Sequence, residues 1–124
     1  MKLNPDCIRD ILLLVETVSD DESELLFEAE SVSFDDLSRY SAKEVRYHLL
    51  QCKKQNLIEI GIEFIDRSIP VFGLTPEGHR FLEAIRPASR WQRLLSAVAK
   101  DLRSAALGEI VQLASESLKN DLQE

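Results

Sequence analysis

The sequence predicts a mostly helical α+β fold, and three observations indicate it. Apolar side chains recur at helical spacing near both ends of the chain and in its middle. Apolar and polar residues alternate between Ile58 and Phe64, as they do in a half-buried strand. Residues that cap helices precede several of the helical stretches. The 124 residues, of which 44% are hydrophobic and 30% charged, suffice for one ordinary globular core.

The N-terminal third predicts a helix, a short strand and a second, shorter helix. The first helix runs from Pro5 to about Val18, and Asn4 is its cap. A strand follows over residues 25–29, because alternate apolar side chains fall on one face. Ser33 begins a pattern that resembles a capping box, which predicts a short helix over residues 34–39. The apolar side of the strand consists of Leu25, Phe27 and Ala29.

The central segment carries the clearest helix signal in the chain. Ser41 and Glu44 have the spacing of a capping box, and they predict a helix from Ala42 to about Gln55. Asn56 is a residue type that tolerates the left-handed conformation and is suited to end this helix. One side of the helix is apolar, with Val45, Leu49 and Cys52.

A β-hairpin follows the central helix. Its first strand is the alternating stretch from Ile58 to Phe64, its turn lies at residues 66–68, and its second strand runs from Ile69 to Leu74. Pro70 lacks a backbone N–H, so we expect it at a sheet edge or near the start of its strand.

Three more helices are expected after the hairpin. Thr75 is the cap of a helix that runs from Pro76 to about Ile85, and Pro87 ends it. Ser89 can cap the next helix, and a break near residues 103–104 separates that helix from the last one. The apolar stripes of the last two helices consist of Trp91, Leu94, Leu95, Val98 and Leu102, and of Leu107, Ile110, Val111, Ala114 and Leu118.

The order helix, strand, short helix, longer helix, hairpin, helix is that of a winged helix-turn-helix domain. We assign residues 1–86 to this domain and residues 87–124 to a C-terminal helical extension. The extension either folds back on its own domain or pairs across a two-fold axis as a homodimer. Candidate residues for that dimer interface are Trp91, Leu95, Val98, Leu107, Ile110, Val111 and Leu118.

Charge is distributed unevenly along the chain. The net charge is −7, which argues against a generally basic nucleic-acid-binding protein. Residues 1–38 carry two basic and eleven acidic side chains, whereas residues 39–56 carry five basic and one acidic. The basic segment therefore coincides with the predicted central helix.

The basic segment predicts a DNA-recognition helix, with the hairpin turn as a second contact. The same side chains also fit a solvated helix face and a solvated turn, and both interpretations stay open at this stage. The candidate DNA-binding residues are Arg39, Lys43, Arg46, Tyr47, Lys53, Lys54 and Arg67.

Metal binding and catalysis have little support in the sequence. The cysteines and histidines come from three different predicted elements, and none forms a CxxC or HxxxH pair. No glycine-rich phosphate loop and no nucleophile elbow occurs. We expect no metal, no cofactor and no enzymatic activity. The residues considered for a metal are Cys7, His48, Cys52 and His79.

The sequence also predicts a cytoplasmic protein. No apolar run is long enough to span a bilayer, and Asp6 and Asp10 interrupt the stretch that a signal peptide would need. Two cysteines are too few for a disulfide framework, which favours a reducing compartment.

Three segments carry a resemblance to a known family: KLNPDCIRDILL, SAKEVRYHLLQCKKQNLIE, and LTPEGHRFLEAIR followed by a tryptophan. They resemble an uncharacterised family of bacterial and phage proteins, often found in prophages, that carries the domain-of-unknown-function label number twenty-five thirteen. The resemblance implies a winged-helix fold and a mobile-element setting, and it supplies no activity. The central RYHLLQCKKQNLIE is also similar to repressors of the multiple-antibiotic-resistance and phenolic-acid-regulator types, in which this helix enters the DNA major groove.

Two functions are therefore expected, and a third is kept beside them. The first is a small phage-derived DNA-binding module of the transcription-regulator type, with residues 42–55 as recognition helix and residues 66–68 as wing tip. The alternative is an acidic winged-helix module that binds a host protein and no DNA. An acidic mimic of DNA would need ordered rows of carboxylates, which a sequence does not reveal.

Overall fold

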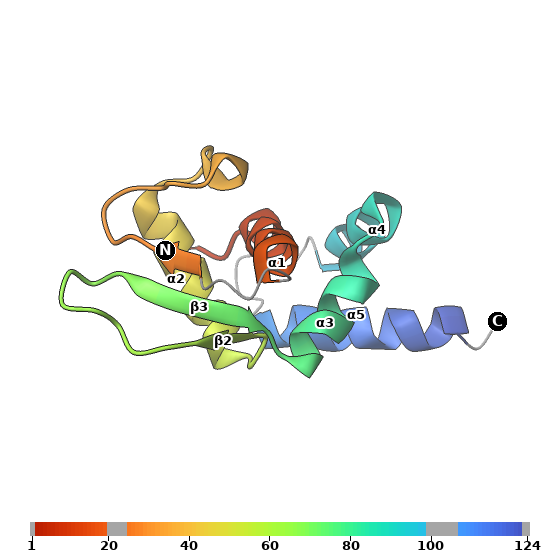
Figure 1. Ribbon diagram of the computed structural model, residues 1–124. Helices are drawn as coiled ribbons and strands as arrows, with labels where there is room; N and C mark the ends of the chain where they lie inside the picture. Colours follow the sequence, from red (N-terminus) through yellow and green to blue (C-terminus); the bar gives the residue numbers. More distant parts are fainter. Residues whose placement is uncertain (1, 20–24, 99–106, 123–124) are drawn as a thin grey trace.

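The computed structural model describes residues 2–19, 25–98 and 107–122. The predicted mixture of helices with a small sheet is confirmed, and the described residues are mostly helical (Figure 1). The elements are α1 (Pro5–Ser19), β1 (Leu25–Phe27), the 3-10 helix η1 (Asp35–Leu37), α2 (Ala42–Lys54), β2 (Ile58–Ile60), β3 (Ile69–Leu74), α3 (Pro76–Ile85), α4 (Ala88–Val98) and α5 (Leu107–Leu122). Among the described helices none is both long and apolar enough to cross a membrane.

The sheet has three antiparallel strands in the order β1-β3-β2. The predicted hairpin is present as the β2–β3 pair, and the short predicted strand pairs with the other edge of β3. Pro70 is therefore in the central strand, opposite Leu26, and the expectation of an edge position for it is wrong. It is the second residue of its strand, so the alternative expectation, a place near the strand start, is confirmed.

The first strand of the hairpin is shorter than the alternating pattern predicts. The pairing register shifts between Glu59 and Ile60, and β2 ends at Ile60. Ile62 is 89% exposed and Phe64 is 48% exposed, so the predicted buried face does not continue through them. A bulge changes which face each later residue occupies, because alternation has a period of two. The prediction of a strand up to Phe64 is therefore wrong.

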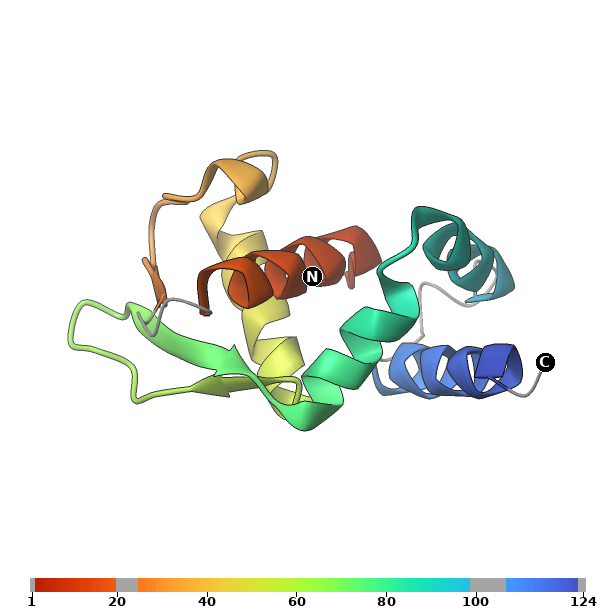
Figure 2. The ribbon, with the colours of Figure 1, turned by 45° about the vertical axis from the view of Figure 1, so that its right-hand side comes forward.

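The core lies between the inner face of the sheet and the helices. α1 packs on β3 and α2, and α3 packs on α1 (Figure 2). The hairpin loop projects at the end of the molecule remote from α4 and α5 (Figures 1 and 2). Helical spacing predicts a buried stripe on α1, of which Cys7, Ile8, Ile11, Leu12 and Val15 are buried and Val18 is partly buried. Leu14, outside that stripe, is buried as well.

Three predicted helix starts have their capping hydrogen bonds. The Asn4 side-chain oxygen accepts from the backbone N–H of Asp6 at 3.1 Å. Ser41 and Glu44 form the reciprocal capping box. The Thr75 hydroxyl accepts from the N–H of Gly78 at 2.9 Å. These signals are local in sequence, and all three predictions are confirmed.

Two other predicted caps are wrong. η1 begins after Phe34, with no side-chain cap, so Ser33 does not cap it and the helix is a single 3-10 turn. α4 begins at Ala88, where the Trp91 N–H donates to the Pro87 carbonyl at 3.0 Å. Ser89 therefore lies inside the first turn of α4. The predicted break near residues 103–104 lies outside the described residues.

Two turns use left-handed backbone. Asn56, which follows the Gln55 C-cap of α2, has φ 57°, which confirms the predicted stop. Arg67, in the hairpin turn, has φ 70°. Asp66 stabilises this turn by accepting from the N–H of Ser68 at 3.0 Å and from its hydroxyl at 2.6 Å.

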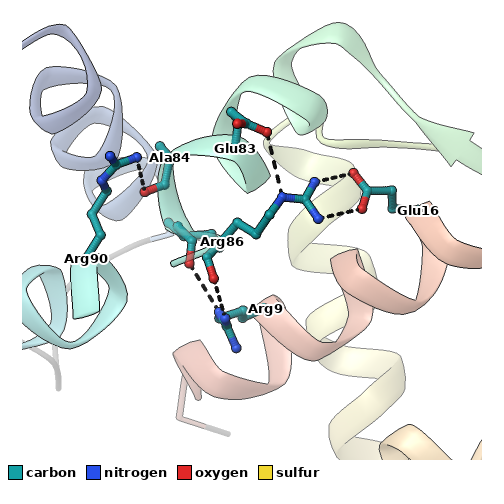
Figure 3. Close-up of polar contacts among 7 residues, drawn as sticks. Arg9, Glu16, Glu83, Ala84, Arg86 and Arg90 are labelled. Atoms are coloured by element: carbon teal, nitrogen blue, oxygen red, sulfur yellow. Dashed lines mark hydrogen bonds and ion pairs between the residues drawn. The ribbon is translucent and has the colours of Figure 1, made fainter. Parts of the chain in front are cut away.

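Arginines from two other helices converge on the C-terminal end of α3 (Figure 3). Arg9 of α1 donates to the Ile85 carbonyl at 3.2 Å and to the Arg86 carbonyl at 2.7 Å. Arg90 of α4 donates to the Ala84 carbonyl at 3.4 Å. These cations satisfy carbonyls that a helix end leaves open, and they lie at the negative end of the helix dipole.

An ion pair also joins the C-terminal end of α3 to α1. Arg86 makes two hydrogen bonds to the Glu16 carboxylate, at 2.8 and 2.5 Å (Figure 3). These bonds lower the pKa of Glu16, since they favour its charged form.

The C-terminal helices pack on the rest of the chain. α5 contacts α3 and α4, and α4 contacts α3. Trp91 of α4 is 3% exposed, and its indole N–H donates to the Asp6 carboxylate of α1 at 2.9 Å. Leu107 and Ile110 of α5 are also buried. The extension predicted for residues 87–124 therefore contributes side chains to the same core as α1 and α3.

Candidate nucleic-acid interface

The outward side of α2 carries a basic face, which we define as Lys43, Tyr47, Lys53 and Lys54. The three lysines are exposed and Tyr47 is half-buried. The opposite side of α2 is buried, as the sequence predicts, with Val45, Leu49 and Cys52 in the core. Lys53 and Lys54 lie in the last turn, where cations interact favourably with the helix dipole. Helical periodicity thus brings these four predicted residues together.

Two adjoining hollows lie beside the α2 basic face. One, of about 380 Å³, lies over the helix itself and is lined by Tyr47, Leu50, Gln51, Lys53 and Lys54. The other, of about 440 Å³, lies between α2 and the hairpin, and its α2 side consists of Arg46, Leu50 and Lys53. Its hairpin side consists of residues 60–63 and Ile69. Leu50 and Lys53 line both, so the helix and the hairpin border one concave surface.

Arg46 ties α2 to the hairpin loop. Its guanidinium donates to the Arg67 carbonyl at 2.7 Å and forms an ion pair with Glu63. The side chain is only 20% exposed. Arg46, which the sequence offers as a contact to DNA, therefore fixes the hairpin relative to α2 here. Arg67 itself is exposed in the hairpin turn, at the other end of this link.

Arg39 is turned toward α1. It pairs with the Asp10 carboxylate at 2.6 Å, and its guanidinium lies 4.9 Å from the centre of the Tyr40 ring. The Tyr40 hydroxyl donates to the same carboxylate at 2.7 Å. Burial, and then the bond to Asp10, raise the pKa of Tyr40. Arg39 is thus part of a cluster that joins the segment before α2 to α1, and it does not lie with the α2 basic face.

His48 is a buried polar residue whose role the sequence does not indicate. Its Nδ1 lies 2.7 Å from the Glu44 carbonyl, which can only accept, so Nδ1 carries the proton. Its Nε2 accepts from the backbone N–H of Asn4 at 2.7 Å. The imidazole therefore joins α2 to the start of α1. Burial lowers the pKa of His48, because it disfavours the charged ring.

Stability should decrease on mild acidification because of His48. Its pKa is lower in the folded chain than in the unfolded one, whose reference value is 6.5. The stabilisation is complete above pH 6.5 and is lost as the pH falls below it, with a slope of up to about 1.4 kcal/mol per pH unit. Urea denaturation between pH 7.5 and pH 5 would measure this slope.

The matched control for this slope is the other histidine. His48→Gln should flatten the decline, whereas His79→Gln, at an exposed site on α3, should retain it. An equal slope of stability against pH in both variants would contradict the assignment of this pH dependence to His48.

His79 is not brought together with the other three residues considered for a metal. Cys7, Cys52 and His48 are buried, whereas His79 is exposed on α3. Burial raises the pKa of Cys7 to about 12, so its thiol stays protonated at neutral pH. Across the described residues, no group of three His, Cys, Asp or Glu side chains is placed to hold a metal ion.

The candidate dimer residues have different surroundings. Trp91, Leu107 and Ile110 are buried in the chain's own core, while Leu95 and Val111 are partly buried. The side chains of Val98 and Leu118 lie outside those described. A two-fold contact between folded chains would therefore use Leu95 and Val111 before the other three.

The comparisons with known proteins give one match. A family model described as "Hypothetical protein (DUF2513)" matches residues 2–104, which is 103 of the 124 residues. This confirms the resemblance to the family labelled twenty-five thirteen. No curated protein and no solved structure matches the chain. The chain therefore belongs to the DUF2513 family of hypothetical proteins.

Proposed function

We propose that the chain is a DNA-binding module of the winged helix-turn-helix type. In this proposal α2 enters the major groove and the β2–β3 hairpin is the wing. The observation that carries it is the α2 basic face, which borders a concave surface shared with the hairpin. A regulator of this type would act in the bacterial cytoplasm, and the family resemblance favours a phage or prophage setting. No enzymatic step is part of the proposal.

The distribution of acidic groups also favours DNA. Among the described residues, Glu63 is the one carboxylate that lines the groove between α2 and the hairpin, and it is paired with Arg46. Glu28 and Glu30 lie instead near β1, at the opposite edge of the sheet. A phosphate backbone lying along α2 would therefore meet lysines without meeting those two carboxylates.

The hydrogen bond from Arg46 to the Arg67 carbonyl is a reason to expect that the hairpin and α2 contact DNA together. Because Arg46 binds the Arg67 carbonyl, the turn that carries the exposed Arg67 is fixed relative to the helix. Contacts by Lys43, Lys53, Lys54 and Arg67 would neutralise about four phosphates, which corresponds to a slope of log affinity against log salt of about −3.6. The affinity should therefore be low at physiological salt and measurable at low salt.

The test is fluorescence polarisation with labelled duplexes selected from genomic fragments, at about 50 and about 200 mM salt. Lys53→Gln/Lys54→Gln should weaken binding by about tenfold or more and make the salt slope shallower by about two units. Neither side chain has a described ion-pair partner, so the variant should fold, with only a small loss of stability from the helix dipole.

Arg93→Gln, at an exposed position on α4, is the matched control and should leave affinity and slope unchanged. Equal binding by the lysine variant and the control would contradict the role of α2. Arg46 is a poor choice for this test, since its loss would also release the hairpin.

A protein-interaction module that binds no DNA is the second candidate. It is favoured by the apolar hairpin loop, where Ile62 is 89% exposed and Ile65 is fully exposed at 104%. The absence of any salt-dependent shift in the assay above, together with a stable complex with a host protein, would support it over the first.

A further inference from the structure

The outer face of the sheet carries exposed apolar side chains. Leu26 of β1 is directly opposite Pro70 of β3, and Phe72 is two residues further along β3. These three side chains share one face because strand residues alternate. Leu26 is 39% exposed and Phe72 is 51% exposed, whereas Pro70 is buried, and α1 packs on β3. We call the exposed Leu26 and Phe72, together with the buried Pro70 of the same face, the outer sheet patch.

The Phe72 ring has a defined position in this patch. A Cβ at Gly61 would lie 2.9 Å from the Phe72 Cζ and 2.9 Å from the Pro70 Cγ. The ring therefore lies across Gly61, which follows β2 and whose N–H donates to the Pro70 carbonyl at 2.8 Å, so an aromatic side chain covers this glycine. Apolar side chains whose conformation is already fixed in the free protein lose less entropy when a partner covers them.

A hollow of about 450 Å³ adjoins the patch at Leu26. Of the residues that the structure describes, three carboxylates border it, and we call it the acidic hollow. Asp66 is held by Ser68, whose hydroxyl and N–H lower the pKa of Asp66. Within the described residues these carboxylates have no ion pair. The lining residues are Leu26, Glu28, Ala29, Glu30, Ser31, Asp66 and Ser68.

The charge of this surface decides which partner it fits. Three carboxylates repel a nucleic-acid backbone, so the hollow is unsuited to DNA. A two-fold contact between two copies would bring two sets of carboxylates together, and each copy already has a net charge of −7. A partner segment with lysine or arginine next to apolar side chains would complement the charge of the acidic hollow and cover the outer sheet patch.

We propose that the outer sheet patch and the acidic hollow bind a segment of a partner protein that carries basic and apolar side chains together. The acidic hollow and Leu26 lie at the β1 edge of the sheet, Phe72 extends the patch across the central strand, and the α2 basic face adjoins the β2 edge. The inference therefore does not rest on DNA binding by α2, and the two faces can be tested separately.

The test uses the full chain and three short labelled peptides: alternating Lys and Leu, alternating Lys and Ser, and alternating Glu and Leu. The Lys/Leu peptide should bind saturably and at least about tenfold more tightly than either of the others. Amide chemical shifts of the isotopically labelled chain should change at residues 25–30 and 66–72. Equal binding of Lys/Leu and Lys/Ser, or shifts confined to α2, would overturn the proposal.

Two variants and one control test the surface itself. Phe72→Ser and Glu28→Gln/Glu30→Gln should each weaken Lys/Leu binding by about fivefold or more, and both change exposed side chains. Lys53→Gln/Lys54→Gln, which tests the DNA proposal, should leave peptide binding unchanged. Unchanged affinity in both surface variants would overturn the proposal. A dimer of this chain that excludes the peptide and that Phe72→Ser disrupts would assign the patch to self-association instead.

Discussion

Replacing Gly78 by alanine should destabilise the chain by about 2–3 kcal/mol, although alanine normally favours a helix. Gly78 is buried in the first turn of α3, and a Cβ there would lie only 2.0 Å from the Leu57 carbonyl oxygen. That oxygen is a backbone atom which also accepts from the Thr75 N–H at 3.1 Å. The substitution must therefore move α3 away from the base of the hairpin. Urea denaturation at pH 7 measures the loss.

Gly108→Ala is the matched control for this prediction. A Cβ at Gly108, in the first turn of α5, would meet only the flexible Gln55 side chain, at 3.1 Å or more. We expect a change within about 0.5 kcal/mol, because that side chain can move. A loss at Gly78 no greater than that at Gly108 would show that α3 does not need to approach Leu57 so closely.

Replacing Trp91 by alanine should cost about 3–5 kcal/mol. The side chain is 3% exposed, and it joins α4 to α1 through the bond to Asp6. Because the tryptophan packs within one chain, the loss caused by Trp91→Ala should be the same at every protein concentration. Scanning calorimetry over a wide range of concentrations checks both statements.

Trp91→Phe is the milder substitution at this position. It retains much of the apolar contact and removes the indole N–H donor together with part of the ring, so we expect a loss smaller than that of Trp91→Ala. A midpoint that rises with concentration in the parent chain, and no longer does so in Trp91→Ala, would instead place Trp91 at an interface between copies.

Features set by neighbouring residues were predictable from the sequence. The capping box of Ser41 and Glu44 and the left-handed Asn56 each depend on a few adjacent positions. The hairpin was predictable for the same reason, since its strands are adjacent in the chain. Its bulge was not, because the shift between Glu59 and Ile60 leaves the apolar alternation of the sequence intact. Pairing of β1 with β3 was also hidden, because it joins residues more than forty positions apart.

The residues of the candidate site also differ in whether local sequence or distant contacts determine their position. Lys43, Lys53 and Lys54 share a helix face because a helix has a fixed period, so the sequence could group them. Arg46 was grouped with them but is engaged by Glu63, seventeen positions away. Sequence spacing contains no information on that pairing, nor on the contact between Arg39 and Asp10. His48 was considered only as a metal ligand, because its partner Asn4 lies 44 positions away.

The arginine contacts at the end of α3 have a mechanical consequence. Arg9 and Arg90 bind carbonyls at this corner, so the turn from α3 into α4 is braced from both sides. At its other end α3 abuts Leu57 through Gly78. The ten-residue helix is thus a strut between the C-terminal helices and the base of the hairpin. Moving either end of α3 would therefore have to break one of these sets of contacts.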